Sequence, residues 1–153
     1  LREVIAAANI LAEDFGVQAD VWSCPSFNEL KRDGDDCVRW NLMHPDQKPR
    51  IPHVTACLEK HSGPVVAATD YVKLFADQIR AYVGRNFHVL GTDGFGRSDT
   101  RASLRRHFEV NRYYVTVAAL KTLADEGTIP AKTVKSAIRK YKLDPEKPNP
   151  LHV

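Results

Sequence analysis

The sequence lacks the features that mark membrane-spanning, secreted and disulfide-rich proteins. No apolar run approaches the roughly 20 residues that a membrane helix requires, and no basic segment followed by an apolar one opens the chain. Cysteine is scarce, and Cys24, Cys37 and Cys57 form no C-x-x-C pair, so we expect reduced thiols and neither a disulfide framework nor a zinc site. These absences favour a soluble, cytoplasmic protein.

Excess charge and catalytic motifs are also missing. The 22 Lys and Arg residues exceed the 19 Asp and Glu residues only enough for a net charge of +3, which is too small and too dispersed to indicate nucleic-acid binding. None of the six histidines lies in an H-E-x-x-H pattern, and no serine lies in G-x-S-x-G. The sequence therefore shows no motif that marks a catalytic residue or a metal ligand.

The composition that is present is typical of one globular domain covering residues 1–153. Apolar residues three and four positions apart predict a helix from Leu1 to Phe15 that ends at Gly16, without a capping residue in front of it. A short strand is expected over residues 19–23. The S-x-x-E pattern at Ser26 then predicts a helix toward Met43, with Asp33-Gly34 as a candidate interruption, followed by an irregular proline-containing connection.

Two further strands are predicted, over residues 65–68 and 87–90. Asp70 is expected to cap a helix that ends near Gly84 and carries along its line Leu74, Phe75, Gln78, Ile79 and Tyr82. Three more helices follow at residues 99–107, 111–125 and 130–141, the first capped by Ser98 or Asp99, and residues 144–153 form an extended proline-rich tail.

Strands that each lead into a helix indicate an α/β fold of three αβα layers with a mostly parallel sheet. In such sheets, ligands and partners bind at the carboxyl ends of the strands. Here those ends lie near Ser23, Asp70 and Thr92.

The segment from Gly91 to Ser98 differs from the phosphate-binding pattern G-x-x-x-x-G-K-[ST] only by Arg97 in place of lysine. It has two interpretations. One is a structural turn, because glycine readily adopts the backbone conformations of tight turns. Asp93 also favours this interpretation, because its negative charge opposes phosphate binding. The alternative is a small nucleotide- or anion-binding regulatory module that uses Gly91, Gly96, Arg97 and Ser98.

Arg97, Arg101 and Arg105 are spaced four apart and predict a basic stripe on the helix that follows. Such a stripe can hold a phosphate or an acidic partner. The alternative is a solvated face with weak ion pairs to nearby carboxylates, for which Asp93, Asp99 and Glu109 are the candidates.

Longer stretches resemble one known family. The segments at residues 1–16, 20–23, 26–30, 39–42, 68–71, 90–99 and 104–110, and the proline-rich ending, are similar to the C-terminal domain of the homodimeric, thiamine-diphosphate-dependent pyruvate dehydrogenases of bacterial complexes. The wider transketolase group has a related glycine turn. The resemblance covers essentially the whole chain.

The resemblance implies a three-domain enzyme of which this chain is the C-terminal domain. That enzyme decarboxylates pyruvate on thiamine diphosphate and passes the two-carbon unit to the lipoyl group of dihydrolipoyl acetyltransferase. In that family the cofactor and magnesium lie between the first two domains. The resemblance therefore implies no catalytic, cofactor-binding or metal-binding residue in this chain. The fold of the family places a strand before the first helix, and we expect the domain to melt higher with that strand restored.

The resemblance and the strand ends together predict an interface with the preceding domains and with the second subunit of a homodimer. Alone, the chain is expected to catalyse nothing. The residues expected at the interface lie at the two strand ends and in the glycine turn: Asp70, Tyr71, Thr92, Asp93, Phe95, Arg97 and Ser98.

Overall fold

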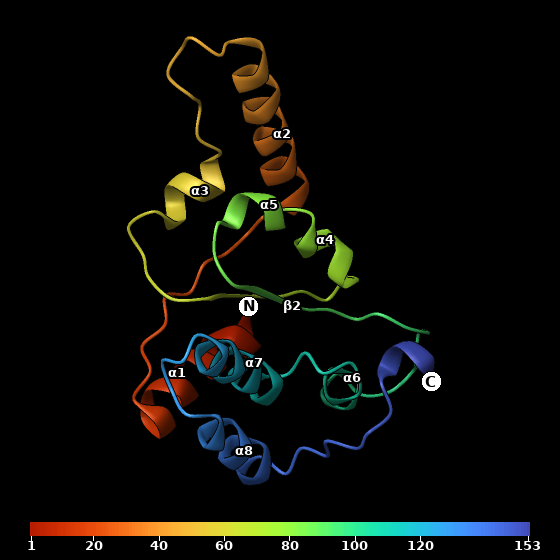
Figure 1. Cartoon of the computed structure of the whole chain (residues 1–153). Coiled ribbons are helices and arrows are strands. Elements are labelled where there is room, and N and C mark those ends of the chain that lie inside the picture. Colours follow the sequence, from red (N-terminus) through yellow and green to blue (C-terminus); the bar gives the residue numbers. More distant parts are fainter.

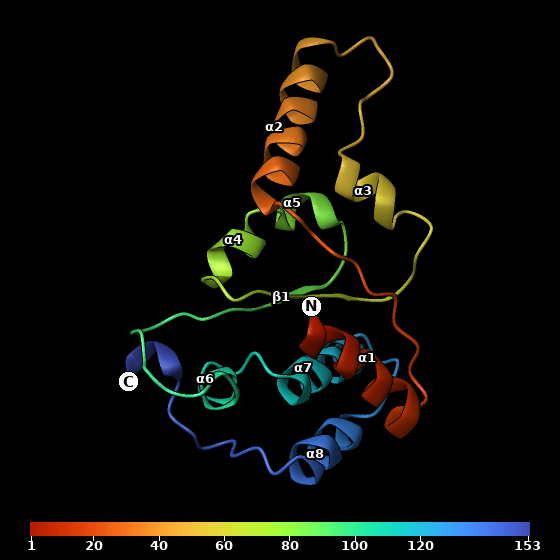
Figure 2. The same cartoon turned by 180° about the vertical axis from the view of Figure 1, so that it is seen from behind.

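The computed structural model describes all residues, 1–153, and has three layers. A two-stranded parallel sheet lies in the middle, with β1 (Val65–Ala68) paired to β2 (Phe87–Leu90) in the register Val65 to Phe87. Helices cover both faces of the sheet, as Figures 1 and 2 show from opposite sides. The α/β class and the αβα layering expected from the sequence are confirmed, with two strands in place of three.

One face of the sheet is covered by α7, which packs against both strands, with α1 beside it and α8 further from the sheet. Leu11, Leu120, Val134 and Ala137 form the buried cluster of this layer. The helices are α1 (Arg2–Phe15), α6 (Arg101–His107), α7 (Arg112–Asp125) and α8 (Ala131–Lys140).

The opposite face is covered by α4 and α5, while α2 and α3 stand further from the sheet (Figure 2). The larger buried cluster lies here and is built from Val54, Leu58, Ala76, Ile79, Val83, Phe87 and Val89. The helices are α2 (Phe27–Met43), α3 (His53–Leu58), α4 (Lys73–Asp77) and α5 (Arg80–Val83).

Several local predictions are confirmed. Gly16 ends α1 in the left-handed conformation, with φ of 66°, and Gly84 ends α5 in the same way with φ of 69°. The Ser26 hydroxyl accepts a hydrogen bond from the backbone nitrogen of Glu29 at 3.2 Å and so caps α2. These features depend on neighbouring residues alone.

The strand expected over residues 19–23 is absent. No backbone hydrogen bond joins residues 19–23 to another strand. The Val17 nitrogen, just before this stretch, donates to the Leu11 carbonyl at the end of α1. A strand requires a partner for its outward N–H and C=O groups. As a result Ser23 does not join the other strand ends.

The expected interruption of α2 at Asp33-Gly34 is also wrong. A Cβ at Gly34 would lie 2.3 Å from the ring of Tyr82, so the glycine admits that ring against a continuous helix. The Tyr82 hydroxyl donates to the carboxylate of Asp35 at 2.5 Å. The short helix α3 was not anticipated.

The single helix expected after Asp70 is divided into α4 and α5. Val72, and not Asp70, occupies the position before α4, and no side chain caps it. Within α4 only Ala76 is buried, whereas Leu74 and Phe75 of the predicted apolar line are exposed. The next helix, α6, is capped by Thr100, whose hydroxyl accepts from the Ser103 nitrogen at 3.2 Å, and not by Ser98 or Asp99.

The proline-rich tail is not extended throughout. Asn149 accepts a hydrogen bond from the Leu151 nitrogen and opens a short 3₁₀ helix, η1 (Pro150–His152). No helix of the protein combines the length and the apolar character needed to cross a bilayer.

Candidate interface at the carboxyl edge of the sheet

The ends of β1 and β2 are joined directly by Thr92. Its backbone nitrogen donates to the Tyr71 carbonyl at 2.9 Å, and its hydroxyl donates to the Asp70 carbonyl at 2.8 Å. The Tyr71 nitrogen in turn donates to the hydroxyl of Thr69 at 3.1 Å. The predicted proximity of Asp70, Tyr71 and Thr92 is therefore present in the structure.

Gly91 permits this junction. A Cβ at that position would lie 2.7 Å from both the Tyr71 oxygen and the Lys73 nitrogen, which are backbone atoms with no room to move. The glycine is needed for close approach of two backbone segments.

Asp93 contacts the start of α4. Its carboxylate accepts a hydrogen bond from the Lys73 nitrogen at 3.3 Å and lies 4.0 Å from the Lys73 ammonium. The carboxylate is thus engaged with the neighbouring helix rather than aimed into the loop.

The far half of the loop is open. The side chains of Phe95, Arg97 and Ser98 are exposed, and no hydrogen bond or ion pair within the chain holds them. The structure therefore connects four of the seven predicted residues closely and leaves these three further out on the same loop.

Apolar side chains are exposed at this edge and on the loop that leaves it. Phe95 is 76% exposed, Leu74 is 72% exposed and Tyr71 is 69% exposed, and the Tyr71 and Phe75 rings lie 5.4 Å apart between centroids. Leu74 and Phe75 were missed as surface residues because their spacing is that of a helix facing the core. Clustered exposed apolar residues are typical of interaction surfaces.

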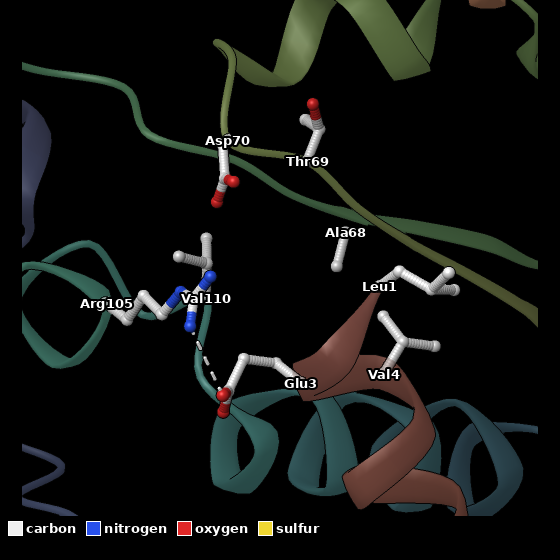
Figure 3. Close-up of a pocket in the computed structure, with 8 residues that line it drawn as sticks. All are labelled: Leu1, Glu3, Val4, Ala68, Thr69, Asp70, Arg105 and Val110. Carbon is white, nitrogen blue, oxygen red and sulfur yellow. Dashed lines mark hydrogen bonds and ion pairs between the residues drawn. The ribbon is translucent and has the colours of Figure 1, made fainter. Parts of the chain in front are cut away.

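A cavity of about 50 Å³ lies beside this edge, between α1, α6 and the end of β1 (Figure 3). The side chains of Asp70 and Arg105 approach it from opposite sides, and Arg105 extends toward Glu3 (Figure 3). Its lining residues are Leu1, Glu3, Val4, Ala68, Thr69, Asp70, Arg105 and Val110.

Glu3 links α1 to the two helices that follow the loop. Its carboxylate accepts hydrogen bonds from the Arg112 backbone nitrogen at 2.9 Å and from the Arg112 guanidinium at 3.1 Å, and it lies 3.4 Å from Arg105. The Arg112 side-chain hydrogen bonds lower the pKa of Glu3, although partial burial opposes them.

This network corrects the expected pairing of the arginine stripe. Arg105 pairs with Glu3, while Glu109 pairs with Lys147 at 3.0 Å and Asp93 lies near Lys73. The partners are distant in sequence, so spacing alone gave no signal for them.

The geometry of the loop differs from that of a phosphate-binding loop. In such loops the residues that bind phosphate open the helix directly, so that the helix amides converge on the anion. Here α6 begins only at Arg101, which leaves Arg97 and Ser98 outside the helix. No group of three or more His, Cys, Asp and Glu side chains is placed to hold a metal ion.

The sequence of this chain is similar to one domain family and to several named proteins. A family model described as the transketolase-like TK C-terminal domain matches residues 1–111. The chain is 60% identical over 152 residues to the pyruvate dehydrogenase E1 component of Cupriavidus necator, and 59% identical over 152 residues to that of Pseudomonas aeruginosa. It is 54% identical over 151 residues to the pyruvate dehydrogenase E1 component of Escherichia coli strain K12.

These alignments cover 98% to 99% of this chain but 17% of each relative. The chain therefore spans about one sixth of the length of the curated relatives it matches. The family match includes both strands and the whole carboxyl edge, while residues 112–153 lie beyond it. The chain belongs to the transketolase-like TK C-terminal domain family.

Proposed function

We propose that the chain is the C-terminal domain of a cytoplasmic, homodimeric pyruvate dehydrogenase E1 component, and that it serves there as an interface domain. The observation that carries the proposal is the 60% identity to such an E1 component over 99% of this chain. The name of that relative supports the class of the parent enzyme. The interface role of this domain is supported by the residues exposed on its own surface.

The parent enzyme, in this proposal, decarboxylates pyruvate with thiamine diphosphate and magnesium and acetylates the lipoyl group of dihydrolipoyl acetyltransferase. The residues of this chain do not fit that cofactor. Magnesium bound to a diphosphate prefers several carboxylate, carbonyl and water oxygens in octahedral geometry. The Asp93 carboxylate, in the most phosphate-like loop of the chain, already accepts a hydrogen bond from Lys73. We therefore assign the chemistry to the remainder of the longer protein.

The interface role is supported by the carboxyl edge. Tyr71 and Leu74 expose apolar surface there, and the loop that leaves this edge exposes Phe95 and the unpaired Arg97. Interface surfaces are enriched in aromatic residues and arginine. We propose that this edge contacts the preceding domains of the same polypeptide and the second subunit.

The first test compares the 153-residue chain with the longer protein that contains it. Pyruvate-dependent acetylation of a lipoyl domain, with thiamine diphosphate and magnesium, is expected for the longer protein and not for the chain alone. Lipoyl acetylation by the chain alone would contradict the interface role, and a longer protein inactive with pyruvate would contradict the parent activity.

The second test uses two surface substitutions in the longer protein. Phe95 and Leu42 are each 76% exposed, but Leu42 lies on α2, away from the carboxyl edge. Phe95→Asp is expected to weaken subunit association and activity, and Leu42→Asp is the matched control. Equal effects of the two substitutions on sedimentation and turnover would refute the assignment of the interface to this edge.

The nucleotide alternative is tested by titrating the chain with ATP and magnesium. The start of α6 at Arg101 does not favour it. Saturable heat that disappears in the Arg97→Ala variant would replace the interface proposal with a nucleotide-binding function.

A further inference from the structure

The apex of the Gly91–Ser98 loop has no hydrogen bonds to hold its shape. Thr92 and Asp93 attach the start of the loop to the body, and Thr100 attaches its end to α6. Between these anchors no hydrogen bond joins residues 94–98 to any other part of the chain. Such a segment is expected to be disordered unless something packs against it.

The C-terminal tail, residues 144–153, runs back along α6 toward this loop (Figures 1 and 2). It is anchored on the way by Lys147, whose ammonium donates to the carbonyl of His107 at 2.7 Å and to the carboxylate of Glu109 at 3.0 Å. The last carbonyls of a helix carry partial negative charge, so the ammonium is attracted both to the end of α6 and to the Glu109 carboxylate.

The tail ends on the loop. Pro150 is buried although it lies three residues from the end of the sequence. The contact is with Gly94, where an added Cβ would lie 2.2 Å from the Pro150 oxygen and 3.3 Å from the Leu151 Cα. Gly94 also has φ of 111°, a conformation that other residues rarely adopt.

We propose that the tail is a strap that fixes the conformation of the loop apex, and thereby positions Phe95 and Arg97. The loop supplies a glycine where the backbones touch. The tail supplies a buried proline, with Lys147 as its anchor to the body and the Asn149 cap shaping the turn around it. The strap lies in residues 112–153, which the family model does not match. Its effect on docking rests on the proposed function, whereas the strap itself does not.

The test is made on the 153-residue chain labelled with ¹⁵N. In the unaltered chain, backbone order parameters of residues 94–98 are expected near 0.85, the value of rigid backbone. Deletion of residues 150–153 is expected to lower them below about 0.6, the range of flexible segments. Tryptic cleavage after Arg97 should then become about tenfold faster, because proteolysis follows the population of open conformations.

Two matched pairs of variants separate the strap from general damage. Lys147→Ala removes the anchor and should loosen the loop, while Lys132→Ala, at an exposed lysine without a partner, should not. Gly94→Ala should release the tail, so that Leu151 and Val153 give random-coil shifts. Gly96→Ala should leave the tail in place, because its Cβ would meet open space.

Unchanged order parameters after the deletion, or flexible residues 94–98 in the unaltered chain, would overturn the proposal. The docking consequence is measured separately, as subunit association and lipoyl acetylation by the longer protein lacking residues 150–153. A loosened loop with unchanged association and activity would confirm the strap and refute its part in docking. A loosened loop together with loss of association and of activity would support the strap and also its part in docking.

Discussion

Replacing Glu3 with alanine removes the acceptor that joins α1 to the start of α7. The Glu3 side chain is only 15% exposed and receives three hydrogen bonds from Arg112, one of them from the backbone. Hydrogen bonds to charged groups contribute about 1.5 to 3 kcal/mol, and breaking a fully buried ion pair costs about 3 to 5 kcal/mol. Because the Arg112 side chain is 42% exposed, water compensates part of the loss.

We therefore expect the free energy of unfolding to fall by about 2 kcal/mol, which lowers the Tm by about 4 to 8 °C for a domain of this size. Calorimetry or circular dichroism of the purified chain measures this. Glu13→Ala is the matched control, since Glu13 lies exposed on the same helix without a bonded partner. A Tm of the Glu3→Ala variant no lower than that of Glu13→Ala would contradict a stabilising role of the Glu3 carboxylate.

The stabilisation by Glu3 also has a defined pH dependence. The pKa of Glu3 is lowered in the folded protein, chiefly by hydrogen bonds from Arg112, from an ordinary value of 4.5. The stabilisation is thus complete above pH 4.5 and is lost as the pH falls through the folded pKa. The Tm difference between the unaltered chain and Glu3→Gln should be constant near neutrality and shrink in acid. A difference that grows as the pH falls would contradict the direction of this shift.

Three further predictions concern stability measured by thermal unfolding. Ser26→Ala removes the cap of α2 and should cost about 1 kcal/mol, more than Ser136→Ala on the exposed face of α8. Gly34→Ala should destabilise the chain because its Cβ meets the Tyr82 ring at 2.3 Å, but should stabilise a Tyr82→Ala variant, where only the gain in helix propensity of about 1 kcal/mol remains. Burial and the hydrogen bond to Asp14 raise the pKa of Tyr141, so stability should fall with rising pH above about 10, and Tyr141→Phe should abolish most of that slope.

Features that depend on residues close along the chain could be predicted from the sequence. The periodicity of α1, the left-handed Gly16 that ends it and the cap at Ser26 follow from side chains within one helical turn. The helix α7, the helix α8 after Pro130 and both strands were also located correctly. The layer order followed because a buried parallel strand must be covered on both faces.

For the candidate interface, the sequence identified the strand ends and the glycine turn. Parallel strands end at a common edge of their sheet, which is why the sequence predicts the proximity of Asp70 and Thr92. The same rule failed for Ser23, since a strand exists only where a second strand satisfies its backbone groups. The apolar spacing revealed neither the break between α4 and α5 nor the exposure of Leu74 and Phe75.

Contacts between residues far apart in the sequence could not be predicted, because they form only when the chain is folded. Glu3 and Arg112 are 109 positions apart in the sequence. Gly34 is required because the ring of Tyr82 packs against it, and Gly94 contacts Pro150 in the C-terminal tail. Each of these contacts depends on where packing brings separate segments, and not on local propensity. The glycine turn was therefore recognisable in the sequence, but the tail that holds it was not.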